Sequence, residues 1–377
     1  MIKIVEAITK KQMKTFATFP IKLYKGNKNY VPSILGDEVN LLDPKKNLMM
    51  GESRVRCFLA YKDGKLVGRT AGIIPVAGNR KNNEKVLRIS RIDFINDIEV
   101  CKALIRTLKE WAIKEGLDTI SGPWGFNDTD REGMLTYGFD QKSTYATAYS
   151  HQYYVSFFEE MGFVKESEWI EYQFNYKNSD PKFHEHAEKL RKEGRFVDLC
   201  ETMPLRKIIN NYGDSFFDCY NAAYKDLDNF VKIDGDQKTQ TLKQFATIIN
   251  KKFFSCVVDK EANKVVAFGV GLPYIGNCLR RAKGRMLFAA LPIFCTIQHP
   301  KNIELALIGV LPEYANLGTH AIVVDRFLKN FTKYKIKNVW MDPVLTTNLK
   351  MHQTWKGMDK SIRQRRQTWN IPVSKIK

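Results

Sequence analysis

Apolar positions along this 377-residue chain follow two patterns, short apolar runs typical of strands and a spacing of three or four residues typical of helices. Residues 55–76, "VRCFLAYKDGKLVGRTAGIIPV", form two apolar runs joined by Asp63-Gly64, and this arrangement predicts a β-hairpin. Residues 97–116 carry apolar side chains every three or four positions and end in a glycine, which predicts a helix. Short apolar runs at 86–95 and 117–123 predict strands. The first half therefore predicts a hairpin, a strand, a helix and another strand.

The second half repeats this order of elements. A hairpin is predicted at residues 253–273, a strand at 303–310, a helix at 320–335 and a strand at 338–345. Residue identity between the halves is low, so the repeat is one of architecture. The mixture of strands and helices predicts an α/β (α+β) protein.

Residues 177–194 are polar and charged, and we interpret them as a connecting helix. The predicted organisation is a first unit at 1–176, the connecting helix, and a second unit at 195–377. A length of 377 residues also favours two domains over one.

Composition places the chain among ordinary globular proteins, because 44% of the residues are apolar and 27% are charged. The net charge is +19, from 60 Lys and Arg against 41 Asp and Glu. Such a charge favours attraction to tRNA or another polyanion, while solvated lysine-rich faces are the alternative interpretation.

Sequence features favour a reducing compartment and a cytoplasmic protein. The seven cysteines form no Cys-x-x-Cys pair and lie mostly in apolar segments, which predicts buried thiols. The longest apolar run, residues 286–297, contains Pro292 and is too short to span a bilayer. We therefore expect no membrane span.

An acidic, glycine-rich stretch, "GPWGFNDTDREGMLTYGFD", occupies residues 122–140. Asp128, Asp130 and Glu132 match the first positions of a calcium-binding loop. Position 12 of that loop requires a bidentate glutamate and is Phe139 here. The sequence therefore argues against calcium, and no metal site is predicted.

Two interpretations of this stretch stay open. Its acidic side chains can cap turns and the helix that follows. Alternatively, a glycine-rich loop at the end of a strand can line a ligand site. The substrate-site hypothesis names Asn127, Asp128, Glu132 and Tyr154.

The strongest chemical signal is "IELALIGVLPEYANLGTHAIVVDRFLKN", residues 303–330. A strand ends at Val310, Pro312 prevents its continuation, and a turn containing Gly318 leads directly into a helix. Such a turn directs backbone N–H groups and the positive end of a helix dipole at one point, where a pyrophosphate can bind. An ordinary strand-to-helix turn is the alternative.

These residues resemble the acetyl-CoA-binding strand, loop and helix of GNAT-fold N-acyltransferases. Further blocks, spread over nearly the whole chain, are similar to a bacterial family with two GNAT-like units, sometimes called YghO-like. The blocks are "FPIKLYKGNKNYVP", "FLAYKDGKLVGR", "GPWGFNDTDREGMLTYGFD", "YYVSFFEEMGF", "GVLPEYANLG" and "PVLTTNLKM". The resemblance implies two tandem units, each with a mixed, mostly antiparallel central sheet flanked by helices.

The resemblance also implies roles for particular residues of the second unit. Glu304 would act as general base, taking a proton from an attacking amine, and acetyl-CoA or another acyl-CoA would be the acyl donor. The acceptor would be the amine of a small molecule or peptide. The implied cofactor contacts are Val310, Gly318, Thr319, His320, Ala321 and Asn348.

The sequence departs from the family pattern at several of these positions. The family's loop has Gln or Arg where this chain has Ala315, and a small residue where it has His320. The family's tyrosine, which protonates the leaving thiolate, corresponds to Trp355 in the second half and to Phe158 in the first. The first half passes to its helix through Asn96-Asp97 without a phosphate loop.

Three functional hypotheses follow. The first is an acyl-CoA-dependent N-acyltransferase. The second is an aminoacyl-tRNA-dependent transferase, favoured by the +19 charge and the degenerate loop. The third is a binding protein in which both GNAT-like units have lost catalysis, as the absence of both tyrosines suggests.

Overall fold

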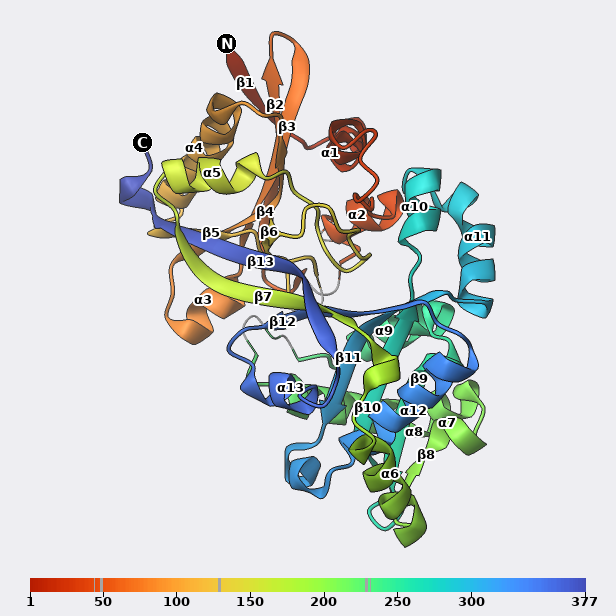
Figure 1. Ribbon diagram of the computed structural model, residues 1–377. Coiled ribbons are helices and arrows are strands. Elements are labelled where there is room, and N and C mark those ends of the chain that lie inside the picture. The colour runs from red at the N-terminus through yellow and green to blue at the C-terminus, as the bar shows by residue number, and fades with distance from the viewer. Residues whose placement is uncertain (44, 48–49, 128–129, 228–229, 231) are drawn as a thin grey trace. The chain divides into compact units, whose positions relative to one another are not determined.

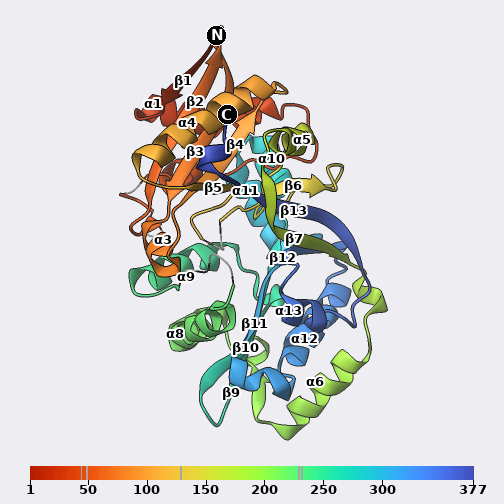
Figure 2. The same cartoon turned by 90° about the vertical axis from the view of Figure 1, so that its left-hand side faces the viewer.

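A computed structural model describes residues 1–43, 45–47, 50–127, 130–227, 230 and 232–377. The chain divides into two compact units (Figures 1 and 2). The first unit comprises Met1–Ile170, Gly276–Leu291 and Arg363–Lys377, and the second comprises Glu171–Ile275 and Pro292–Ile362.

The first unit contains a mixed sheet in the order β1-β2-β3-β4-β5-β13-β7, with β6 also paired to β13. All neighbours with a described register are antiparallel except the parallel pair β4 and β5. The strands are β1 (Ile2–Glu6), β2 (Arg54–Lys62), β3 (Lys65–Ile74), β4 (Val86–Phe94), β5 (Thr119–Gly122), β6 (Met134–Tyr137), β7 (Val164–Phe174) and β13 (Lys360–Pro372).

Helices cover both faces of this sheet (Figure 1). On one face, α4 packs Leu104, Leu108 and Trp111 into a core with apolar side chains of β4 and β5. On the other, Phe16 of α1 packs against Leu59 and neighbouring residues. The helices are α1 (Lys10–Leu23), α2 (Leu35–Leu41), α3 (Val76–Asn82), α4 (Ile98–Lys114), α5 (Tyr153–Glu160) and α10 (Gly276–Ala282).

Local sequence signals account for several of these elements. The predicted hairpin is confirmed, because Asp63 and Gly64 take left-handed φ values of 50° and 75° between β2 and β3. The Asp97 side chain accepts a hydrogen bond of 3.0 Å from the Glu99 N–H and begins α4. Gly116, with φ 67°, follows the end of that helix.

The second unit contains the end of β7 and a sheet in the order β7-β12-β11-β10-β9-β8. Neighbours from β11 to β8 are antiparallel, whereas β11 and β12 are parallel. The strands are β8 (Phe196–Asp198), β9 (Phe254–Asp259), β10 (Lys264–Pro273), β11 (Asn302–Val310) and β12 (Asn338–Leu345).

Two long helices lie on opposite faces of this sheet. Gly269 of β10 faces Val323 and Phe327 of α12, whereas Phe268, the preceding residue, is on the face of α8. The helices are α6 (Lys182–Glu193), α7 (Leu199–Thr202), α8 (Leu205–Tyr224), α9 (Asp236–Ile248), α12 (His320–Lys333) and α13 (Leu349–Thr354). One further helix, α11 (Met286–Gln298), is shared between the units at Leu291.

The predicted fold class is confirmed, since each unit has a mixed, mostly antiparallel sheet flanked by helices. The division of the chain differs from the predicted one. The predicted second unit comprises all of 195–377, whereas Gly276–Leu291 and Arg363–Lys377 group with the first unit. The connecting segment 177–194 contains α6, which belongs to the second unit.

In both units the parallel strand pair is short, and the two strands then part. In the first unit the pairing runs from Val86 with Thr119 to Arg88 with Ser121, while β4 continues to Phe94. In the second it runs from Asn302 with Asn338 to Leu305 with Met341, while β11 continues to Val310. Beyond these points the two strands no longer pair with each other, and in the second unit the Ile308 N–H and carbonyl are hydrogen-bonded to the Tyr224 hydroxyl.

Within the described residues, none of the helices is both long enough and apolar enough to cross a bilayer.

Tight packing of β3 against α4 generates a stability prediction. A Cβ atom at Gly72 would lie 2.8 Å from Trp111 Cζ3 and 2.9 Å from Leu108 Cδ2. We expect Gly72→Ala to lower the free energy of unfolding by about 1–3 kcal/mol, because the helix must shift to relieve the overlap. Urea denaturation measures this.

Gly36→Ala is the matched control in the same unit. Gly36 lies in α2, and no heavy atom lies within 4 Å of a Cβ built there. Alanine in a helix should change the free energy of unfolding by less than about 1 kcal/mol, in the stabilising direction. Equal effects of the two substitutions would contradict the packing argument.

Candidate functional site

The segment after β11 folds as the sequence predicts, with a strand, a turn and a helix. A 3-10 helix, η4 (Pro312–Leu317), follows the strand, and Gly318 adopts a left-handed φ of 72° before α12 begins at His320. Two hydrogen bonds fix the first part of this turn. The Leu311 N–H donates to the Val266 carbonyl at 2.9 Å, and the Tyr314 hydroxyl donates to Asp259 Oδ2 at 3.0 Å.

Five of the six predicted cofactor contacts lie between Val310 and Ala321, whereas Asn348 lies at the start of α13. Val310 is partly buried at the end of β11, and Ala321 is buried in the first turn of α12. Thr319 is fully buried, and its Oγ1 has no hydrogen-bond partner among the described residues. A buried hydroxyl in this state, beside a helix N-terminus, is suited to a ligand that can accept its hydrogen bond.

Two imidazoles lie at the same turn. His186 of α6 approaches Gly318 so closely that a Cβ on this glycine would be 2.1 Å from His186 Nε2. Burial and, to a smaller extent, His186 lower the pKa of His320. A neutral imidazole carries one N–H donor, so His320 can contribute a hydrogen bond here without bearing charge.

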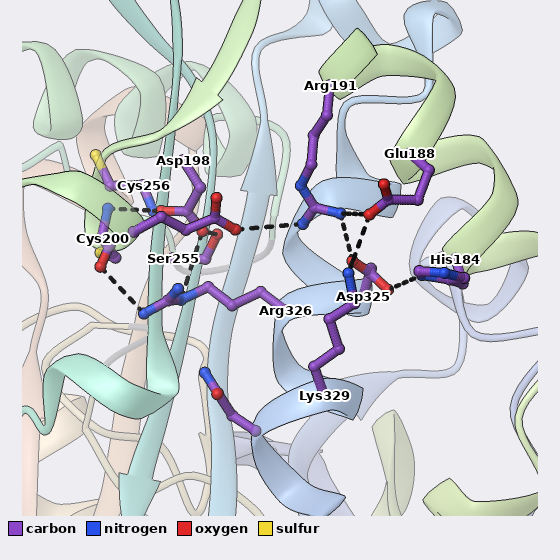
Figure 3. Close-up of polar contacts among 12 residues, drawn as sticks. His184, Glu188, Arg191, Asp198, Cys200, Ser255, Cys256, Asp325, Arg326 and Lys329 are labelled. Atoms are coloured by element: carbon purple, nitrogen blue, oxygen red, sulfur yellow. Dashed lines mark hydrogen bonds and ion pairs between the residues drawn. The ribbon is translucent and has the colours of Figure 1, made fainter. Parts of the chain in front are cut away.

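Helix α12 is attached to α6 through Asp325 (Figure 3). Its carboxylate meets His184 Nδ1 at 2.8 Å, Arg191 Nη1 at 2.5 Å and Lys329 Nζ at 2.9 Å. Burial alone would raise the pKa of Asp325, but these hydrogen bonds outweigh it and the pKa is lowered. The attachment therefore consists of a buried anion with several cationic neighbours.

This group does not have the character of a metal site, although His184, Glu188 and Asp325 place ligand atoms within 4.8 Å of one another. Arg191 and Lys329 already bring positive charge to the Asp325 carboxylate, and a metal ion there would be repelled. A hollow of about 600 Å³ along α6 has only this helix's His184, Glu185, Glu188, Lys189, Lys192 and Glu193 as its lining. We interpret it as a polar helix surface.

On its other side α12 is held by Arg326. The guanidinium donates to the Phe254 carbonyl at 2.8 Å and lies 3.5 Å from Asp198 Oδ2 (Figure 3). Asp198 also accepts hydrogen bonds from the Ser255 hydroxyl at 2.5 Å and the Cys200 N–H at 2.8 Å. The start of α12 is thereby fixed relative to β8 and β9.

The cysteines beside this network are not candidate nucleophiles. Burial, with the nearby Asp198 carboxylate as a smaller cause, raises the pKa of Cys200 and Cys256 well above the usual thiol value. A thiol must lose its proton to act as a nucleophile, and these do not at neutral pH.

Glu304, the predicted base, lies on β11 next to the point where β11 and β12 part. It is 3% exposed, and it faces Leu272 across β10 and Trp340 across β12 in the sheet register. The following residue, Leu305, makes the last pairing with β12. Glu304 therefore lies on the strand one residue before the two strands part.

The structure assigns Asn348 a capping role, since its Oδ1 accepts a hydrogen bond of 3.1 Å from the Met351 N–H at the start of α13. Trp355, at the place of the family's tyrosine, is buried and packs on Phe174 with ring centroids 5.0 Å apart. Phe158, at the equivalent place in the first unit, is fully buried. Neither position supplies a hydroxyl group.

A second polar cluster, which the sequence analysis missed, lies inside the first unit beyond the parting of β4 and β5. Asp93 of β4 accepts hydrogen bonds from the Tyr24 hydroxyl at 2.8 Å and from Arg69 Nε at 2.8 Å. Arg69 also lies 3.4 Å from Glu38, and Arg91 lies 3.6 Å from the same carboxylate oxygen. All four charged groups are buried.

The pKa values of the two carboxyl groups in this cluster, Asp93 and Glu38, are shifted in opposite directions. Burial raises the pKa of Asp93 despite the opposing effect of Arg69. For Glu38, burial acts in the same direction, but Arg91 and Arg69 outweigh it and lower the pKa. Beside them is a cavity of about 40 Å³, whose lining includes Tyr30, Ser33 and Arg131. This volume suits one or a few water molecules.

The acidic loop contributes to this cluster through Asp130. Its Oδ1 lies 2.7 Å from Arg91 Nη2, and its Oδ2 accepts a hydrogen bond from the Phe126 N–H. This geometry matches the interpretation of the loop's acids as turn-forming groups. Asp128, which the substrate hypothesis names, lies outside the described residues.

The other three proposed substrate contacts, Asn127, Glu132 and Tyr154, are buried or half-buried. Asn127 is buried, and Glu132 is half-buried in the same loop. Tyr154 is buried, and its hydroxyl accepts a hydrogen bond of 2.9 Å from the Phe94 N–H and lies 3.1 Å from the Tyr24 hydroxyl. It therefore belongs to the Asp93 cluster.

A weak signal for this cluster was present in "RISRIDF". The segment contains Arg91 and Asp93 among apolar strand residues, and six of the nine residues of β4 are buried. Buried charged residues require partners. The partners Glu38 and Arg69 lie far away in the sequence, so the sequence alone did not identify them.

The Asp93 cluster generates a prediction for stability and pH. Arg69→Met removes the cation shared by two buried carboxylates, and we expect a loss of about 3–5 kcal/mol at pH 7. Glu38, with its lowered pKa, contributes stability above its unfolded pKa of about 4.3, and this is lost as the pH falls. The loss should therefore be smaller at about pH 3.5, below that unfolded pKa, as urea denaturation at both pH values can show.

Arg80→Met is the control, because its partner Glu52 and Arg80 itself are both exposed. We expect it to cost less than about 1 kcal/mol at either pH. An equally small, pH-independent effect of Arg69→Met would refute the view that the cluster is a network of buried charges.

Comparisons with known proteins agree with this architecture. No protein-family model matches the chain. Protein YghO of Escherichia coli (strain K12) is 21% identical over 355 residues, which cover 92% of this chain and 89% of YghO. Bacterial ceramide synthase of Caulobacter vibrioides is 23% identical over 328 residues, which cover 83% of this chain and 81% of that protein.

Among solved structures, a tandem GNAT protein from the clavulanic acid biosynthesis pathway superposes with a TM-score of 0.57 and 11% identity, covering 99% of both chains. This confirms the fold that the sequence motifs predicted. Similarity to YghO likewise extends over most of the chain. The chain has the tandem GNAT fold.

Proposed function

We propose that this protein is an N-acyltransferase that uses an acyl-CoA as donor. The observation that carries the proposal is the parting of β11 and β12 after Leu305 and Met341, followed by the turn at Gly318 and the start of α12. Between the parted strands the Ile308 N–H and carbonyl are hydrogen-bonded to the Tyr224 hydroxyl, and an extended, amide-containing ligand such as the pantetheine arm of coenzyme A would take the place of that hydroxyl. The helix N-terminus suits its pyrophosphate.

Residues at the turn fit this ligand. The buried Thr319 hydroxyl has no partner among the described residues and can donate to a phosphate oxygen. His186 and His320 add imidazole N–H groups beside Gly318. They replace the small side chains and the Gln or Arg that the GNAT pattern has at this turn.

The chemistry requires little else from the protein. The donor supplies an activated acyl thioester, and the acceptor amine forms a new C–N bond at its carbonyl carbon while the C–S bond breaks. Glu304 is the candidate general base, directly or through water, for the proton that the amine loses. Because a thiol has a pKa near 8.5, the thiolate can leave without a protein acid at Trp355 or Phe158.

For the acceptor, we propose the amine of a long-chain lipid base. The support is the similarity to a protein named bacterial ceramide synthase, since a ceramide is an N-acylated long-chain amino alcohol. This finer proposal is tested separately, by comparing turnover of long-chain and short-chain amines with the same acyl-CoA. Equal turnover of both would contradict it.

Loss of the Thr319 hydroxyl tests the cofactor site. Thr319→Val keeps the shape, and we expect the dissociation constant for acyl-CoA to rise roughly tenfold, the value of one lost hydrogen bond. Stability should not fall, because the hydroxyl has no protein partner among the described residues. Isothermal calorimetry and thermal melting measure both quantities.

Thr332→Val, near the far end of α12, is the control and should leave acyl-CoA affinity unchanged. Gly318→Glu tests the site less selectively than Thr319→Val, because any side chain at position 318 would also displace His186. An unchanged affinity in Thr319→Val, or no binding by the native protein, would count against an acyl-CoA site at this turn.

Removal of the Glu304 charge tests the proposed base. We expect Glu304→Gln to lower kcat by on the order of 10²- to 10⁴-fold with little change in acyl-CoA affinity. Glu313→Gln is the control, since this acid lies in the same segment but is exposed and paired with Lys264. Amine acylation assayed by release of free thiol is the measurement.

Turnover that persists in Glu304→Gln would exclude this residue as base. If no amine is acylated by the native protein while acyl-CoA binds, the hypothesis of a catalytically inactive binding protein is favoured instead. Salt-sensitive tRNA binding without acyl-CoA binding would favour the tRNA-dependent alternative.

A further inference from the structure

Helix α11 presents large apolar side chains to solvent. Its residues Met286–Gln298, "MLFAALPIFCTIQ", include no charged residue. Leu287 is 87% exposed, Phe288 61% and Leu291 72%, and Phe294 on the next turn is 59% exposed. Ala289, Ile293 and Ile297 form its buried side. An exposed apolar surface of this kind marks a docking site for an apolar partner.

Basic residues come directly before this surface. Arg280 and Arg281 end α10, and Lys283 and Arg285 lie in the turn that leads to α11. Arg281, Lys283 and Arg285 are exposed, and no carboxylate of the described residues forms a salt bridge with them. We call these four residues the basic cluster. The basic cluster and the exposed Leu287, Phe288 and Leu291 thus adjoin each other within the first unit.

The segment is anchored at its base, away from its apolar side. A Cβ at Gly284 would lie 2.3 Å from the Ser33 carbonyl oxygen, and the Gly284 carbonyl accepts a hydrogen bond of 3.0 Å from the Leu35 N–H. Arg280 donates to the Lys28 carbonyl. The turn between α10 and α11 is therefore fixed to the loop before α2, which leaves Leu287, Phe288 and Leu291 for another contact.

We propose that α11 and the basic cluster dock on the surface of a bilayer that contains anionic lipids. The apolar side chains would enter the region between headgroups and acyl chains, and the basic cluster would contact the headgroups. A helix of this length lies in the interface and does not cross the bilayer. The +19 charge of the chain adds long-range attraction to the same surface.

The distribution of side chains favours a bilayer over a protein partner. Leu287 and Phe288 are consecutive, so they point about 100° apart around the helix, whereas a helix that binds in a protein groove shows one narrow stripe. A second copy related by a two-fold axis through α11 would bring two basic clusters together, which is unfavourable. A fluid bilayer satisfies both the apolar and the basic requirement.

The test is co-sedimentation of the full chain with vesicles, without any acyl-CoA. We expect binding to phosphatidylcholine vesicles that contain about 30% phosphatidylglycerol, and at least tenfold weaker binding to phosphatidylcholine alone. The double variant Leu287→Ser and Leu291→Ser should bind the anionic vesicles at least tenfold more weakly. Ile113→Ser on α4, another exposed apolar position at 59%, is the control and should bind as the native protein does.

A second variant tests the charge independently. Arg281→Gln with Lys283→Gln should weaken binding to anionic vesicles by about tenfold while leaving binding to neutral vesicles unchanged. Thermal melting checks that each variant is folded. Folding is expected because the four substituted side chains, Arg281, Lys283, Leu287 and Leu291, are exposed.

Three outcomes would overturn the proposal. The native protein fails to sediment with anionic vesicles, or the leucine variant sediments as the native protein does. Alternatively, light scattering without lipid shows a dimer that the leucine variant abolishes, which would make a second copy the occupant. The proposal does not rest on acyl transfer, so a failed acyltransferase assay leaves it standing.

Discussion

The position of α12 depends on two adjacent residues of opposite charge. Asp325 meets Arg191 and Lys329 on the side of α6, while Arg326 meets Asp198 and the Phe254 carbonyl on the side of the sheet. Consecutive residues of a helix point about 100° apart, so the pair fixes the helix about its own axis as well as along it. Because α12 begins at His320, the contacts of Asp325 and Arg326 also hold the turn at Gly318 and Thr319 in position.

The two units use the same strand arrangement for different purposes. In the second unit the parallel strands part and lead to a glycine turn with a buried hydroxyl group. In the first, β4 is followed almost at once by Asp97, which caps α4, and the space beyond the parting holds Asp93, Arg69 and Tyr24. The two units therefore share one strand arrangement, but the second unit has a candidate ligand-binding turn and the first has a buried ionic network.

Features encoded within a short stretch of sequence were predictable. The Asp63-Gly64 hairpin, the α4 helix ending before Gly116 and the turn after Val310 each follow from a few neighbouring residues. Contacts between distant residues were not. Nothing near Gly318 indicates that His186 would lie against it, and nothing near Asp93 indicates Glu38. The sequence also gave no sign that the final strand belongs to the first unit, because strand pairing depends on tertiary structure.

That final strand has a consequence for synthesis. The segment Arg363–Pro372 of β13 inserts between β5 and β7 and buries Trp369 and Arg366, so it forms part of the interior of a unit that begins at Met1. A ribosome releases the amino-terminal part of a chain first. The sheet of the first unit cannot be completed until translation has passed Pro372. Until then β5 and β7 each have an unpaired edge, and a chain truncated before Arg363 would lack the strand that lies between them.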